Sequence, residues 1–141
     1  EGTVISDAVN LSSRLEGLTK MYGAGVIVSD HTLQNLKKNY HYRILDRVKV
    51  KGKSKPVEIF EIMDGLSGEA LEKKLSTKAD FEQALVYYFE GYFDKALELF
   101  KKILVINPRD KAAELYVERC ETFLTEGAPI EWDGVMTLKT K

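Results

Sequence analysis

The chain has 141 residues, of which 44% are hydrophobic and 30% are charged, a composition typical of a soluble globular protein. Its 21 Lys and Arg residues nearly balance 22 Asp and Glu residues, so the net charge of -1 provides no chain-wide field that would attract nucleic acid. The only cysteine, Cys120, excludes an internal disulfide, and no apolar run approaches the roughly 18 residues of a membrane span. No signal-peptide pattern opens the sequence, and we expect a cytoplasmic protein.

The first region, residues 1–63, mixes helical and strand patterns. Ser6 or Asp7 can cap a helix that continues to about Tyr22, with Gly23 as its C-terminal stop. A buried stripe at three- and four-residue spacing supports this helix: Ala8, Leu11, Leu15, Leu18 and Tyr22. The residues before it are typical of the interior of a strand or turn, which predicts that the chain continues upstream in a longer protein.

Strand patterns dominate the rest of this region. A short apolar run at residues 25–29 indicates a buried strand, and a capped short helix follows at 30–37. Residues 42–50 form a half-exposed strand because polar and apolar residues alternate, and residues 57–62 form the returning strand of a β-hairpin. The order helix, strand, helix, strand, strand predicts an α+β sandwich.

Residues 79–126 are helical throughout. Gly91 separates a first helix from a second, which ends at Asn107-Pro108, and residues 111–125 form a third. The prediction for this region is therefore an all-α hairpin followed by one more helix.

Two segments flank the helical region. Residues 64–78 are polar and predict a linker, and residues 127–141 are expected to form a C-terminal tail. Trp132 is the only tryptophan of the chain, and we interpret it as a hydrophobic anchor for this tail rather than as a ligand contact.

The helical hairpin resembles one tetratricopeptide repeat over roughly residues 77–110. The match consists of small residues, aromatics, a turn glycine and a closing proline: Ala84, Tyr87, Gly91, Ala96, Phe100 and Pro108. Asp80 and Gln83 depart from the family, which has a large aromatic residue and Leu at these positions. One repeat buries too little to stand alone, so two interpretations stay open. In the first, the extension packs on the α+β part and stabilises it. In the second, it binds a protein partner or contacts the other subunit of a dimer.

Two motifs in residues 1–63 resemble the C-terminal half of a class III nucleotidyl cyclase catalytic domain. The first is TVISDAVNLSSRLE at 3–16, followed by Tyr22-Gly23, and the second is LDRVKVKGK at 45–53. The resemblance implies part of a ferredoxin-like cyclase sandwich and a head-to-tail homodimer with active sites between the two chains. It also implies a phosphorus–oxygen lyase reaction that converts ATP into 3′,5′-cyclic AMP and pyrophosphate, with Mg²⁺ or Mn²⁺ as cofactor.

Position by position, the resemblance gives roles to four residues. Asn10 matches the residue that orients the ribose, and Arg14 matches the one that stabilises charge on the α-phosphate in the transition state. Lys51 matches a lysine that binds the terminal phosphates, and Thr3 the base-selecting position, where Thr favours adenine over guanine. A guanidinium and an amide on one helix face suit phosphoryl transfer, which depends on positioning and electrostatic stabilisation. Guanylate specificity remains the alternative.

Each of these features also has a plainer interpretation from spacing alone. Asn10 and Arg14 lie about 100° from the buried stripe and could form a solvated helix face. The basic residues 51–55 could form an ordinary charged turn, and Asp46 and Arg47 are interpreted as a charge pair on the strand surface.

The metal-binding residues of the family are not expected in this chain. Its two metal-binding aspartates precede the position matched by Thr3, and Asp7 falls at a helix cap. We therefore expect the 141 residues to be inactive alone and to work as part of a longer enzyme. The alternative is a non-catalytic cyclase-like module that serves dimerisation and protein interaction.

Overall fold

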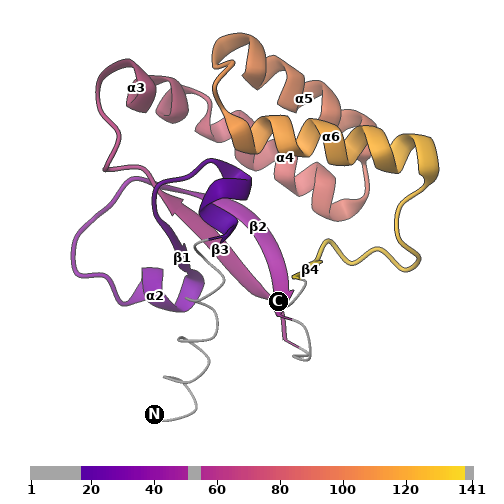
Figure 1. Ribbon diagram of the computed structural model, residues 1–141, viewed down its shortest axis with the longest axis horizontal. Coiled ribbons are helices and arrows are strands. Elements are labelled where there is room, and N and C mark those ends of the chain that lie inside the picture. Colours follow the sequence, from indigo (N-terminus) through magenta and orange to yellow (C-terminus); the bar gives the residue numbers. More distant parts are fainter. Residues whose placement is uncertain (1–16, 51–54, 139–141) are drawn as a thin grey trace.

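The computed structural model describes residues 17–50 and 55–138 of the chain. They form a mixed α+β structure in which a four-stranded sheet packs against a group of helices (Figure 1). The α+β class expected from the sequence is confirmed. Among the described residues, no helix is both long and apolar enough to cross a membrane.

The strands of the sheet lie in the order β1-β3-β2-β4. β2 (Tyr42–Val50) and β3 (Val57–Ile62) are antiparallel neighbours, so the predicted hairpin is confirmed. β1 (Ile27–Ser29) pairs with the other edge of β3, also antiparallel. β4 (Met136–Leu138) comes from the expected tail and pairs in parallel with the last three residues of β2.

A β-bulge interrupts β2. Ile44 faces Phe60 and Asp46 faces Ile59, so Leu45 is an extra residue in this strand. The bulge shifts the alternation of buried and exposed positions by one residue, so that Asp46 and Val48 are buried in addition to Arg43 and Leu45. The regular alternation predicted from the sequence is therefore corrected at this point.

The helices begin and end at recognisable sequence signals. Residues 17–22 are helical and are followed by Gly23, whose positive φ of 66° suits a glycine stop. The further helices are α2 (Asp30–Gln34), α3 (Gly68–Ser76), α4 (Lys78–Glu90), α5 (Phe93–Ile106) and α6 (Lys111–Glu126). Gly91 ends α4 in the left-handed conformation, as predicted. α3 lies within residues 64–78, which the sequence analysis treats as a linker.

A single hydrophobic core joins the sheet to the helices. α4, α5 and α6 lie together on one side of the sheet (Figure 1). Side chains from both parts belong to one buried cluster, including Leu45, Val48 and Ile59 from strands and Phe81, Phe100 and Tyr116 from helices. The helical extension therefore packs on the α+β part and shares its core.

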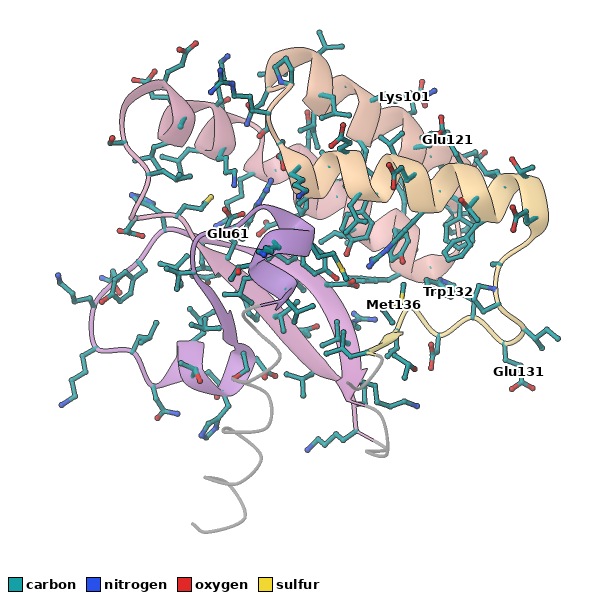
Figure 2. All side chains as sticks on the ribbon, viewed as in Figure 1. Glu61, Lys101, Glu121, Glu131, Trp132 and Met136 are labelled. Carbon is teal, nitrogen blue, oxygen red and sulfur yellow. The ribbon has the colours of Figure 1, made fainter. Side chains whose placement is uncertain are left out.

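Trp132 anchors the segment that leads from α6 to β4 (Figure 2). Its ring packs against Phe93 and Phe123, with centroid separations of 5.6 and 5.3 Å. Its indole Nε1 donates a hydrogen bond to the carbonyl oxygen of Tyr88 at 3.0 Å. The predicted anchoring role of Trp132 is confirmed, and the anchored segment delivers Met136 to the sheet.

Candidate active site

Thr3, Asn10, Arg14 and Lys51, the residues to which the sequence analysis gives roles, lie outside the described residues. Their roles remain predictions. The structure does describe the two elements beside them in the sequence. Residues 17–22 continue the helix predicted to carry Asn10 and Arg14, and β2 ends at Val50, immediately before Lys51.

The first of two buried polar clusters joins these two elements, and we call Tyr22, Asp46 and Arg119 the Asp46 cluster. The Tyr22 hydroxyl donates to Asp46 Oδ2 at 2.5 Å, and Arg119 Nη1 donates to the same oxygen at 2.8 Å. Arg119 Nη2 also donates to the Tyr22 hydroxyl at 3.4 Å. One carboxylate thus connects the 17–22 helix, strand β2 and helix α6.

The surroundings of the Asp46 cluster fix its charge states. Burial, followed by the charge of Asp46, raises the pKa of Tyr22 well above its usual value, so the phenol stays protonated and remains a donor. Burial alone would lower the pKa of Arg119, but its buried partners, the Asp46 carboxylate among them, more than offset burial and raise it. The cluster is a buried ion pair completed by a neutral phenol.

Asp46 and Arg47 do not form the strand-surface charge pair that the sequence predicts. The side chain of Asp46 is fully buried and pairs with Arg119, while Arg47 reaches Glu58, Nε to Oε2, at 3.4 Å. The Arg47 guanidinium also lies 4.3 Å from the ring centroid of Phe89. The bulge explains the error because it turns Asp46 toward the helices.

The second cluster lies near the start of β2 and consists of Arg43, Glu61, Lys74 and Asp110; we call it the Arg43 cluster. Arg43 donates from Nη1 and Nη2 to the two carboxylate oxygens of Asp110, both at 2.8 Å, and from Nε to Glu61 at 2.9 Å. The second carboxylate oxygen of Glu61 (Figure 2) accepts from Lys74 Nζ. Two cations and two carboxylates therefore balance inside the protein.

Asp110 performs two tasks in the Arg43 cluster. Its Oδ1 accepts from the backbone N–H of Ala113 at 3.2 Å and so caps the N-terminus of α6. Burial alone would raise the pKa of Asp110, but the hydrogen bonds and charge of Arg43 outweigh burial and lower it. The Arg43 guanidinium in turn lies 3.9 Å from the ring centroid of Phe81 on α4. This cluster therefore fastens α3, α4 and α6 to β2 and β3.

Neither cluster has the character of a metal centre or of a nucleophile. In the described ranges, no group of three or more His, Cys, Asp or Glu side chains is arranged to hold a metal ion. Cys120 is buried, and burial raises the pKa of its thiol to about 12, which disfavours the reactive thiolate. The described polar clusters are instead suited to holding elements together.

The role of these six charged residues in connecting elements is not predicted from the sequence. Arg43 and Glu61 face each other in the hairpin register, and a charged pair inside two predicted strands is the one local signal that could have drawn attention to them. Their partners on α3 and α6 are distant in the sequence, and no pattern in a single sequence shows such a pairing.

Three curated proteins are similar to the chain. An adenylate cyclase of Dictyostelium discoideum, described as terminal-differentiation specific, is 32% identical over 123 residues, or 85% of this chain. Adenylate cyclases of Anabaena cylindrica and Rhizobium meliloti are 43% and 38% identical over 65 and 61 residues, or 44% and 43% of this chain. The chain contains an adenylate cyclase-related region. No family model and no solved structure matches it.

The three matches cover different lengths of this chain and only small parts of the relatives. The chain spans only 6%, 13% and 9% of the lengths of the three relatives, so their full activities do not transfer to it directly. A match to 85% of the chain cannot fit within residues 1–63, and the Dictyostelium similarity therefore includes residues of the helical extension. The other two matches have about the length of the predicted cyclase-like part alone.

Proposed function

We propose that this chain is part of an adenylate cyclase that converts ATP into 3′,5′-cyclic AMP and pyrophosphate in intracellular signalling. The observation that carries the proposal is the similarity to three adenylate cyclases, together with the two cyclase motifs at 3–16 and 45–53. The intact enzyme works as a homodimer, with its active sites at the interface between two cyclase parts.

In this proposal the chain supplies residues that handle the triphosphate and the ribose. Arg14 stabilises the charge that develops on the α-phosphate, and Asn10 orients the ribose so that its 3′-hydroxyl attacks the phosphorus. Lys51 binds the terminal phosphates as a point charge, and Thr3 contacts the base. These roles require the helix before Gly23 and the end of β2 to be held in a fixed relation.

The divalent metal of the proposed reaction is not assigned to residues of this chain. The described residues offer no group of carboxylates, histidines or thiolates that fits Mg²⁺ or Mn²⁺. We propose that the ligands of the metal lie outside the described residues, upstream of Thr3, as the family resemblance implies.

The proposal is tested with purified intact protein that contains this chain. With ATP and Mg²⁺ or Mn²⁺ we expect cyclic AMP and pyrophosphate in equal amounts, and slower formation of cyclic GMP from GTP. The 141-residue chain alone, at the same concentration, is expected to form neither product. A folded, dimeric intact protein that forms no cyclic nucleotide from ATP or GTP would contradict the proposal and favour a non-catalytic module.

A further inference from the structure

We propose that Arg119, on the helical extension, is a positioning residue of the cyclase: it holds the helix that precedes Gly23 in register with strand β2. The inference rests on the proposed function, and it assigns the extension a role in keeping the two parts of the nucleotide site together. Arg119 acts through Tyr22 and Asp46.

The contacts of Arg119 reach both elements at once. Nη1 is 2.8 Å from Asp46 Oδ2 on β2, and Nη2 is 3.4 Å from the hydroxyl of Tyr22 at the end of the helix. Nη2 also lies 3.9 Å from the sulfur of Met21. Because Tyr22 and Asp46 are also hydrogen-bonded to each other, at 2.5 Å, each member of the Asp46 cluster constrains the other two.

Burial makes the Asp46 cluster rigid. The side chain of Asp46 is fully buried and that of Arg119 is 12% exposed, so little water is available to replace a lost contact. The guanidinium carbon lies 5.1 and 5.7 Å from the ring centroids of Tyr116 and Tyr22. The Tyr116 hydroxyl donates to the carbonyl oxygen of Leu45, the bulged residue, at 2.5 Å. α6 therefore binds the backbone and the side chains of β2 at the bulge.

Two members of the Asp46 cluster lie close in the sequence to predicted site residues, which gives the cluster a functional consequence. Asp46 lies within β2, which ends at Val50, the residue before Lys51 in the sequence. Tyr22 lies in the last turn of the helix that is predicted to carry Asn10 and Arg14. A displacement of about 1 Å between reacting groups can lower a rate about 100-fold, so a loosened joint between these elements is expected to reduce turnover.

Arginine is specifically suited to this joint. Its planar fork offers separate N–H groups to two acceptors, whereas the lysine ammonium is a point charge on a flexible stem. Arg119→Lys therefore keeps the charge beside Asp46 but cannot hold Tyr22 in the same geometry. Arg119→Met removes both contacts while keeping much of the buried apolar stem.

The test compares Arg119→Met and Arg119→Lys with two controls in the intact protein. Lys101→Met removes an exposed cation from the extension, where Lys101 on α5 pairs with Glu121 on α6 at 3.9 Å on the side away from the sheet (Figure 2). Ile103→Ala removes part of a buried side chain of α5 and so lowers stability without changing a residue of the Asp46 cluster. kcat and KM for ATP are measured at a temperature where melting curves show every variant folded. Amide exchange of residues 18–24 and 43–48 is measured in the 141-residue chain.

We expect Arg119→Met to lower kcat at least 10-fold with less than a threefold change in KM. We expect Arg119→Lys to fall between Arg119→Met and wild type, and both controls to stay within twofold of wild type. Exchange of the 18–24 amides should accelerate in Arg119→Met beyond what its change in global stability accounts for, and should not do so in Ile103→Ala. Equal kcat losses in Arg119→Met and Ile103→Ala, or unchanged exchange at 18–24, would overturn the inference. If wild-type protein forms no cyclic nucleotide, the proposed function fails, and the exchange measurement still decides whether Arg119 joins the two elements.

Discussion

Asp110→Ala is expected to lower the free energy of unfolding by about 3–5 kcal/mol, the range for removing one partner of a buried ion pair. The substitution takes away both acceptors of the forked contact from Arg43 and leaves this fully buried guanidinium with Glu61 alone. It also removes the N-cap of α6, which by itself contributes about 1 kcal/mol. Urea denaturation of the 141-residue chain at pH 7, followed by circular dichroism, measures the loss.

Two comparison variants and a pH series sharpen this result. Lys101→Ala removes an exposed charge and should stay within about 0.5 kcal/mol of wild type. Asp110→Asn keeps an oxygen that can cap α6 and should lose less than Asp110→Ala. Because folding lowers the pKa of Asp110, its stabilisation is complete above the unfolded value near 3.8 and disappears as the pH falls below it. A loss under 1 kcal/mol, or a difference from wild type that persists undiminished into strong acid, would refute the role given to the Arg43 cluster.

Arg14→Ala in the intact protein is expected to lower kcat about 100- to 1,000-fold, the usual effect of removing one group that stabilises transition-state charge. KM for ATP should change little, because this interaction strengthens only as the α-phosphate becomes more negative. Arg14→Lys keeps the charge without the planar fork and should recover part of the activity. Initial rates of cyclic AMP formation measure all three proteins.

The matched control for Arg14→Ala is Arg109→Ala, which removes an exposed arginine from the loop before α6. It should retain wild-type turnover. Sedimentation should show the same dimer for both variants, since neither change is directed at the proposed dimer contact. Unchanged turnover in Arg14→Ala would remove the transition-state role from Arg14 and leave Asn10 and Arg14 as a solvated helix face.

Much of the secondary structure follows from local signals in the sequence. Alternation marks β2, the glycines at 23 and 91 stop two helices, and a three- and four-residue spacing marks α4 to α6. These signals work because the residues that define an element are neighbours in the chain. The hairpin is equally local, since only residues 51–56 separate its two strands in the sequence.

The features that local patterns missed depend on distant partners. Asp46 is buried because a bulge turns it toward Arg119, which lies 73 residues away. β4 has three residues, too few for a periodic pattern, and it is a strand only because β2 offers it an edge. The short helix α3, within the expected linker, buries Lys74 against Glu61.

The candidate site residues are predicted on a different basis from the fold. Thr3, Asn10, Arg14 and Lys51 are predicted from a family resemblance, because spacing alone favours a solvated helix face and a charged turn. The similarity to adenylate cyclases strengthens the family interpretation without testing the four roles. The structure adds a physical link between the described elements that lie next to these residues in the sequence, residues 17–22 and β2, through Tyr22, Asp46 and the helical extension.

The central structural claim is that the cyclase-related part and the helical extension form one cooperative unit joined by the two buried clusters. Native-state hydrogen exchange of the 141-residue chain tests it most directly, because exchange reports the free energy of opening for each element separately. We predict that the slowest amides of β2, β3 and α6 exchange with the same free energy. Asp110→Ala should lower that free energy equally in all three elements. Sheet amides that open several kcal/mol more easily than those of α6, and that do not respond to Asp110→Ala, would contradict the claim.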